Sequence, residues 1–246
     1  MDELEKLKKE NEELRKINSV KADLISISAH QLRTSLSAVK WILKMFLDKD
    51  VGALSAEQEN FLNKASQSNE RMISLVNDLL TLSHAEDTTI AFKLEMVDLV
   101  RLTEEILFEF SGEAHKKSIE LIFLKPEVDL PEIKCDGKMI RVVIQNLIEN
   151  AIKYSNVNSK VVISFRKVLE SIEISVRDTG IGIPLTDQGS IFQKFYRSEN
   201  ARKKDPIGSG LGLFTTKEIV EHHNGKIWFE SVDGSGTTFF VLLPLL

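Results

Sequence analysis

Cysteine is nearly absent from this chain of 246 residues, in which Cys135 is the single example. One thiol excludes an intramolecular disulfide and a cysteine-rich zinc site, and it fits a reducing compartment. Long apolar runs are also missing. The best candidate, Phe239–Leu246, is interrupted by Pro244 and falls far short of the ~20 residues that span a bilayer. With no recognisable signal peptide, the sequence predicts a cytoplasmic segment that makes no membrane contact.

An excess of positive charge is missing as well. The 32 Lys and Arg residues are outnumbered by 37 Asp and Glu residues, which gives a formal net charge of −5. Nucleic-acid binding normally requires a basic field, so no nucleic-acid partner is expected. The length allows one large domain or two smaller ones, each with a core of its own.

Glycine and proline do not occur before Gly52. Because these residues are the strongest helix breakers, we expect one uninterrupted helix through Leu47. Within it, residues 1–20 are rich in Glu, Lys and Leu, and their heptad spacing favours a parallel coiled-coil dimer. The heptad positions are Leu4, Leu7, Asn11, Leu14 and Asn18.

A second helix is expected after a break at residues 48–54, because Ser55 and Gln58 have the spacing of a capping box. It should end near His84. Both helices carry an apolar stripe that one hairpin cannot bury, so the pairing of two hairpins into a dimeric four-helix bundle is predicted. The first stripe consists of Leu32, Leu36, Val39, Leu43 and Phe46. The second consists of Leu62, Ala65, Asn69, Met72, Val76 and Leu79.

Beyond a linker at residues 87–90, strand and helix signals alternate. This alternation predicts an α+β sandwich, in which helices cover one face of a mixed sheet. The expected strands are Ala91–Met96, Ile119–Phe123, Lys160–Lys167, Ser171–Arg177 and a final pair that ends near Leu242. The expected helices are Leu99–Lys116, one that begins near Lys138, and one from about Leu211 to His222.

Two glycine-rich segments suggest a nucleotide site. Asp178–Pro184 reads Asp-Thr-Gly-Ile-Gly-Ile-Pro, and Gly208–Leu213 reads Gly-Ser-Gly-Leu-Gly-Leu. A basic segment separates them, and such a pair can form the floor and lid of a nucleotide site. The helix upstream carries Asn146, Asn150 and Lys153 at the spacing of one helix face. Asparagine is a poor interior helix residue, so two on one face indicate a ligand.

These segments resemble the catalytic domain of sensor histidine kinases, in the gyrase/MutL superfamily of ATP-binding folds. Five of that family's sequence boxes occur in the family's order. They are the N box Gln145–Tyr154, the first glycine box Asp178–Pro184, the F box Ile191–Arg197, the second glycine box Gly208–Leu213 and the terminal Gly234–Phe239. Upstream of them, Ala29–Leu36 resembles the family's H box.

The resemblance implies the transmitter region of a two-component system, which can be the cytoplasmic part of a membrane-bound receptor. The expected domains are a coiled-coil signalling helix at 1–20, a dimerisation and histidine phosphotransfer domain at 21–86, and an ATP-binding catalytic domain at 91–246. The family's activity is autophosphorylation of a homodimer with ATP and Mg²⁺. The phosphoryl group then passes to an aspartate on the receiver domain of a response regulator, and phosphatase activity toward that regulator is a further expectation.

In the H box, His30 is the phosphoacceptor that the resemblance implies, with a neutral imidazole nitrogen as nucleophile. It lies two residues from Leu32, about 200° around the helix axis, and should face outward. Gln31 replaces an acidic residue that raises the nucleophilicity of the imidazole in the family. Ser35 replaces a proline, so the helix should bend less there. Thr34 matches the position that orients water for dephosphorylation.

In the ATP site, the resemblance assigns Asp178 to the exocyclic amine of adenine and Arg197 to the γ-phosphate. Asn150, with Asn146 beside it, is expected to hold Mg²⁺ through side-chain oxygens. Several glycines should let the backbone approach the base or open a helix N-terminus toward phosphate. The remaining expected nucleotide-binding residues are Lys153, Tyr154, Gly180, Gly182, Gly208, Gly210, Leu211, Gly212 and Thr237.

Asn146 bears on the choice between two activities. Superfamily members that hydrolyse ATP place a glutamate base at this position, and Glu149 is displaced by about 100° around the helix from Asn150. Phosphoryl transfer to protein is therefore favoured over hydrolysis. Two alternatives stay open: an ATP hydrolase, and a non-enzymatic dimeric scaffold whose Gln31 has weakened catalysis. An aspartic protease built on Asp178 would leave the other boxes unexplained.

Overall fold

The computed structural model describes residues 3–86, 93–126, 128–206 and 208–245. The chain forms two compact units, residues 1–91 and residues 92–246, which we call the helical unit and the α/β unit. None of the described helices combines the length and the apolar character needed to cross a membrane.

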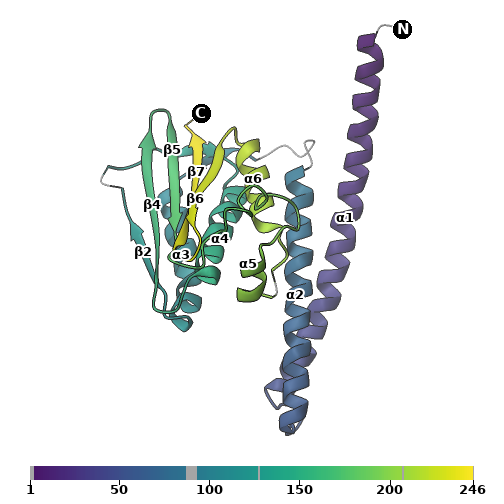
Figure 1. The fold of residues 1–246 in the computed structure, drawn as a ribbon. Coiled ribbons are helices and arrows are strands. Elements are labelled where there is room, and N and C mark those ends of the chain that lie inside the picture. The colour runs from purple at the N-terminus through teal and green to yellow at the C-terminus, as the bar shows by residue number, and fades with distance from the viewer. Residues whose placement is uncertain (1–2, 87–92, 127, 207, 246) are drawn as a thin grey trace. The chain divides into compact units, whose positions relative to one another are not determined.

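The helical unit is a hairpin of two long helices, α1 (Glu3–Leu47) and α2 (Ala56–Glu86) (Figure 1). The prediction of an unbroken helix through Leu47 is confirmed. At the start of α2, the Ser55 hydroxyl accepts the Gln58 N–H at 3.2 Å, and the Gln58 side chain accepts the Ser55 N–H at 2.8 Å. This reciprocal pair confirms the predicted capping box.

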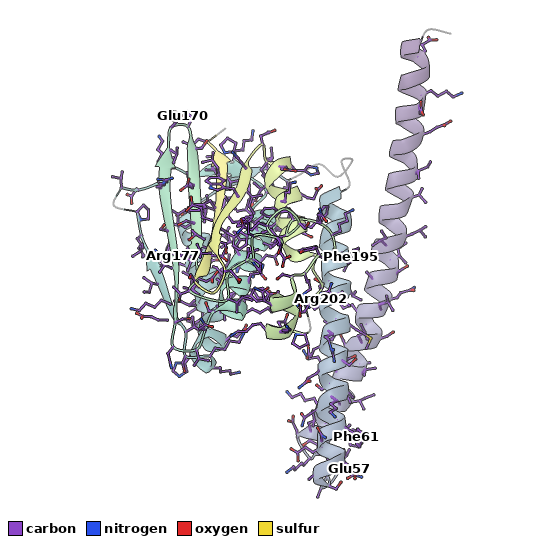
Figure 2. All side chains as sticks on the ribbon, in the orientation of Figure 1. Glu57, Phe61, Glu170, Arg177, Phe195 and Arg202 are labelled. Carbon is purple, nitrogen blue, oxygen red and sulfur yellow. The ribbon has the colours of Figure 1, made fainter. Side chains whose placement is uncertain are left out.

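One hairpin buries only part of its apolar surface. Ala29, Asn69 and Val76 are at most 6% exposed, and the Asn69 amide donates a hydrogen bond of 3.0 Å to the Leu36 carbonyl. Many large apolar side chains stay exposed, among them Phe61 of α2, which is labelled in Figure 2. The exposed stripe residues are Leu32, Val39, Phe46 and Met72, and Trp41, Ile42 and Leu75 are exposed near them in the sequence. Such a surface favours association with a second hairpin.

A five-stranded mixed sheet forms one layer of the α/β unit, with the strand order β2-β4-β5-β7-β6. The pair β2–β4 is parallel, and the other neighbours are antiparallel. Figure 2 labels Glu170, in the β4–β5 turn, and Arg177, at the end of β5. The strands are β2 (Glu120–Leu124), β4 (Lys160–Val168), β5 (Ser171–Arg177), β6 (Lys226–Val232) and β7 (Gly236–Pro244).

Helices α3 (Leu99–Lys116), α4 (Gly137–Tyr154) and α6 (Gly212–His222) lie on one face of this sheet (Figure 1). The alternation of a strand sends every second side chain toward them. In β5 these residues are Ile172, Ile174 and Val176, which are at most 1% exposed. The predicted sandwich, with helices on one face of a mixed sheet, is therefore confirmed.

Three features differ from the sequence prediction. The strand expected at Ala91–Met96 is β1 (Glu95–Val97), and it pairs outside the main sheet with β3 (Ile133–Cys135). Strand β3 has three residues, too few for a periodic signal, and was not predicted. The short helix α5 (Glu199–Lys204) was also missed, because it is polar and buries no residue. The expected linker at 87–90 lies outside the described residues.

Candidate functional site

Helix α4 carries the N box and is fixed in place by its cap and its apolar face. The Asp136 carboxylate accepts the N–H groups of Lys138 and Met139, both at 3.1 Å, and so caps the helix N-terminus. Seven residues of the helix are buried: Ile140, Val143, Ile144, Leu147, Ile148, Ala151 and Ile152. The polar residues of the N box lie half-buried beside this apolar face.

Asn146 joins α4 to the beginning of α6. Its amide nitrogen donates to the Gly212 carbonyl and to the Thr216 hydroxyl, both at 3.3 Å. Thr216 is fully buried and donates in turn to the Gly212 carbonyl at 2.8 Å. This leaves the amide oxygen of Asn146 as an acceptor. Asn150, one turn further along, is half-buried and has no hydrogen-bond partner among the described residues.

Asp178 is the most deeply placed acid of the predicted site, with 6% of its surface exposed. One carboxylate oxygen, Oδ1, accepts the Gly180 N–H at 2.9 Å and the Thr237 N–H at 3.3 Å. Burial raises the pKa of Asp178 to about 6, although these two hydrogen bonds act in the opposite direction. Because both bonds use Oδ1, the second oxygen is left to accept a ligand donor.

The first glycine box is pressed against the end of α4. The Ile181 N–H donates to the Tyr154 carbonyl at 3.2 Å, and a β-bridge links Ser155 to Gly180. A Cβ at Gly180 would lie 2.2 Å from the Tyr154 carbonyl oxygen, which only glycine avoids. Gly182 has a φ of +64°. Glycine is therefore required here for close backbone approach as well as for conformation.

Strand β7 supports the same loop from the other side. The Asp178 N–H donates to the Thr237 carbonyl at 2.8 Å, and the Thr237 hydroxyl lies 2.8 Å from the Ser231 hydroxyl. Ser231 also accepts the Ile183 N–H at 2.9 Å. The structure thus brings Thr237, predicted in the terminal box, to the backbone of the first glycine box.

The segment from Leu185 to residue 207, which we call the lid, ends against the second glycine box. The Phe195 N–H donates to the Gly210 carbonyl at 3.0 Å, and Phe195 has a φ of +63°. A Cβ at Gly210 would lie 2.7 Å from the Phe195 carbonyl carbon. Leu211 is fully buried and precedes α6 directly. Phe195 and Arg202 mark the lid in Figure 2.

Arg197 holds the lid together. Its guanidinium donates to the carbonyls of Gly208 at 2.8 Å and Ala201 at 3.1 Å, and also to the Asp205 carbonyl. The side chain is 10% exposed. Sequence reasoning missed this structural role, since carbonyl partners leave no signal in a motif. The contact of Arg197 with a γ-phosphate stays a prediction.

Lys153 lies between two carboxylates. Its ammonium is 3.5 Å from Glu149, on the same helix, and 3.4 Å from Asp205, in the lid. Burial lowers the pKa of Lys153, but the two carboxylates outweigh it, so the pKa lies above its ordinary value. The ammonium is therefore charged at neutral pH. The sequence did not single out Asp205, because a lone acid after a basic run has no motif.

In the helical unit, the H-box residues lie within α1, which is unbroken at Ser35. The Ser35 hydroxyl donates to the Gln31 carbonyl at 3.1 Å, and the side chains of Gln31 and Thr34 are exposed. Arg33 donates to the Asn77 side chain of α2 at 2.6 Å. The structure describes the backbone of His30 but not its side chain, so the outward orientation stays a prediction.

Two family models match the chain. Residues 20–88 match the His Kinase A phospho-acceptor domain. Residues 135–246 match the histidine kinase-, DNA gyrase B-, and HSP90-like ATPase family. The first match contains the H box, and the second contains the N, F and glycine boxes.

Curated relatives match nearly the whole chain. The sensor histidine kinase WalK of Bacillus subtilis is 36% identical over 241 residues, which cover 94% of this chain and 38% of the relative. The circadian input-output histidine kinase CikA of Synechococcus elongatus is 32% identical over 230 residues, which cover 92% of this chain and 30% of the relative. The chain thus spans well under half the length of these two proteins.

Solved structures agree with the fold. Full-length ShkA in complex with AMPPNP has a TM-score of 0.72 at 25% identity, over 90% of this chain and 45% of that chain. The histidine kinase AdeS of Acinetobacter baumannii has a TM-score of 0.62 at 25% identity, over 88% of this chain and 98% of that chain. The chain belongs to the two-component sensor histidine kinases, and it comprises the phosphoacceptor domain and the ATP-binding domain of that family.

Proposed function

We propose that this chain binds Mg-ATP in the α/β unit, transfers the γ-phosphoryl group to His30, and passes it on to an aspartate of a response-regulator receiver domain. One observation carries the proposal: the chain that has an H box on α1 also holds a buried Asp178, whose loop contacts the end of α4, the helix that carries Asn146 and Lys153. Such a chain holds both the phosphoryl acceptor and the groups that bind the donor.

The adenine end of the proposed site is built around Asp178. With Oδ1 held by two backbone N–H groups, Oδ2 can accept the exocyclic amine of adenine. Gly180 and Gly182 let this loop pack closely against the carbonyls of Tyr154 and Val232, which fixes the backbone that holds Asp178. The AMPPNP complex of the similar kinase ShkA supports an adenine nucleotide as the ligand.

The phosphate end is assigned to Lys153 and to the beginning of α6. Gly208, Gly210 and Gly212 precede or open this helix of 11 residues, whose N-terminal dipole favours an anion. Lys153 adds a charged ammonium from α4. Tyr154 follows it at the end of the same helix.

The residues present also fit a magnesium ion. No group of three His, Cys, Asp or Glu side chains that could hold a metal occurs among the described residues, and the protein ligands proposed here are amide oxygens. The Asn146 oxygen is left as an acceptor, and Asn150 has no competing partner among the described residues. Mg²⁺ accepts such oxygens together with phosphates and water. When bound, the ion would neutralise charge on the phosphates.

His30 is the proposed nucleophile. A neutral imidazole nitrogen attacks the γ-phosphorus, the bond to the oxygen that bridges the β- and γ-phosphates breaks, and ADP leaves with that oxygen. Arg197 is proposed to stabilise the transferred charge once the lid reaches the γ-phosphate. Thr34, exposed on α1, is the proposed orienter of water for a phosphatase reaction on the response regulator.

The geometry favours a kinase over an ATP hydrolase. Hydrolysis needs a base for the attacking water, and an amide cannot serve as one. Asn146 stands at the position where hydrolases carry this base, and its amide nitrogen is committed to Gly212 and Thr216. Glu149 has its carboxylate 3.5 Å from the Lys153 ammonium. Asn146 therefore offers no base, and the Glu149 carboxylate is paired with an ammonium.

The proposal is tested by the fate of label from [γ-³²P]ATP. With wild-type protein and Mg²⁺, we expect label on protein to exceed free phosphate during the first turnover. Asn150→Ala should lose the labelling through loss of Mg-ATP affinity. Release of free phosphate by wild-type protein that does not become labelled would favour an ATP hydrolase. Binding of Mg-ATP with neither labelled protein nor free phosphate would favour a non-enzymatic scaffold.

A further inference from the structure

The lid contributes a carboxylate, that of Asp205, to the proposed phosphate site. One oxygen of Asp205, Oδ2, accepts the Gly208 N–H at 2.9 Å. The same oxygen lies 3.4 Å from the Lys153 ammonium and 3.4 Å from the Arg197 guanidinium. The side chain of Asp205 is 12% exposed, so solvent screens these charges only in part.

The groups around this oxygen are the ones assigned to phosphate. Lys153 comes from the N box, Arg197 from the F box and Gly208 from the second glycine box. An ammonium, a guanidinium and a backbone N–H that converge on one oxygen form the environment that a phosphate oxygen requires. A Cβ at Gly208 would lie 2.9 Å from Oδ2 and 3.1 Å from Arg197 Cζ, so the carboxylate fits closely against the glycine.

We propose that Asp205 is an internal competitor for the nucleotide phosphates, and that it sets the affinity of the site for polyphosphate. This rests on the proposed function of the α/β unit. A phosphate that enters must either displace the carboxylate from Lys153 or remain beside a second negative charge. Both cost free energy, so Asp205 weakens the binding of polyphosphates while it holds the lid to α4 in their absence.

A simpler role does not account for the whole arrangement. Asp205 ends α5, and its backbone N–H bonds to the Ala201 carbonyl. Helix termination uses the backbone alone, however, and requires no carboxylate that reaches across to α4. The ion pair with Lys153 connects the lid to a different element, and it is the contact that a nucleotide would have to break.

Asp205→Asn tests the proposal, because it keeps the shape and an acceptor for Gly208 but removes the charge. Affinities for adenosine, AMP, Mg-ADP and Mg-ATP should be measured by calorimetry. We expect Mg-ATP to bind on the order of tenfold tighter than to wild type, a gain that falls with each phosphate removed and disappears for adenosine. Asp205→Glu should keep wild-type affinities because it retains the charge.

Glu199→Gln is the matched control. It removes the same charge from the same lid, but Glu199 is exposed and pairs with Lys203 at 2.7 Å rather than with Lys153. Its affinities should stay at wild-type values. Unchanged or weaker Mg-ATP binding by Asp205→Asn, or an equal gain for adenosine, overturns the proposal. Wild-type protein that binds no Mg-ATP would instead refute the proposed function itself.

Discussion

At the scale of single residues, the hydrogen bonds to Asp178 determine how the substitution Asp178→Asn would affect ATP binding. The Gly180 and Thr237 N–H groups both point at Oδ1. In Asp178→Asn the amide oxygen must occupy this position, so the NH₂ group replaces Oδ2 and faces the adenine amine. Two donors then oppose each other, which costs about 1–3 kcal/mol and lowers ATP affinity roughly 10- to 100-fold. Calorimetry should show this loss, and an affinity equal to wild type would remove Asp178 from the adenine site.

The raised pKa of Asp178 also predicts how the stability of wild type and of Asp178→Asn should differ with pH. Its value of about 6 lies above the ordinary value of 3.8, so the folded protein holds the proton more tightly than the unfolded chain. Between these two values stability therefore falls as pH rises. Subtracting the unfolding free energy of Asp178→Asn from that of wild type should reveal this slope between pH 4 and pH 6. If this difference in unfolding free energy does not change with pH, or rises with pH, the pKa of Asp178 is not raised by folding.

Gln31 supports a second prediction at this scale. Its amide is exposed beside His30 on α1 and carries no charge. General-base assistance typically contributes about 10² to 10⁴ in rate, and Gln31→Glu restores a carboxylate. We expect faster autophosphorylation at saturating Mg-ATP with little change in ATP affinity, measured in a single turnover. If the rate does not change, the imidazole has another acceptor or a domain motion limits the reaction.

At the scale of elements, the first glycine box and α4 should act as one structure. A Cβ at Gly180 would meet the Tyr154 carbonyl at 2.2 Å, whereas a Cβ at Gly189 in the lid would meet nothing within 4 Å. Gly180→Ala should cost about 1–3 kcal/mol of unfolding free energy, as overpacking typically does, and should weaken ATP binding. Gly189→Ala is the control and should leave ATP affinity unchanged. Equal effects of the two substitutions would mean that the close contact is unimportant.

The elements that sequence predicted best are those with local signals. The capping box at Ser55 and Gln58, the amphipathic pattern of α4 and the alternation in β5 each lie within a few residues, and each was found. Strand β3 was not, since its pairing with β1 joins segments that lie about forty residues apart. The lid contacts of Asp205 were missed for the same reason: they depend on tertiary structure rather than on spacing.

At the scale of the whole molecule, the exposed stripe of the helical unit predicts a dimer. Leu32, Val39 and Phe46 are between 39% and 52% exposed in a single hairpin. Light scattering at micromolar concentration should give twice the mass of one chain. Val39→Asp should shift this toward the monomer, and Ser37→Asp, which adds the same charge at an exposed position outside the stripe, should not. A monomeric wild type would contradict the bundle.

The order of the domains was predictable from sequence because each box is short and the boxes follow a fixed order. The site could be assigned only in part. Asn146, Asp178 and Thr237 were named from motifs, and the structure supplies their partners at Gly212, Thr216 and the backbone of Gly180. Which hydrogen bonds leave an oxygen available is a property of three-dimensional geometry, so no motif reports it.

In the proposed reaction, ATP bound to the α/β unit phosphorylates His30 of the helical unit. The most direct measurement is mass spectrometry of the protein after reaction with Mg-ATP, with the modified residue mapped at neutral or alkaline pH to preserve phosphohistidine. We predict one acid-labile phosphoryl group on the peptide that contains His30, and none in His30→Gln, which should still bind Mg-ATP. An acid-stable group on Ser or Thr, or undiminished phosphorylation of His30→Gln, would contradict the account.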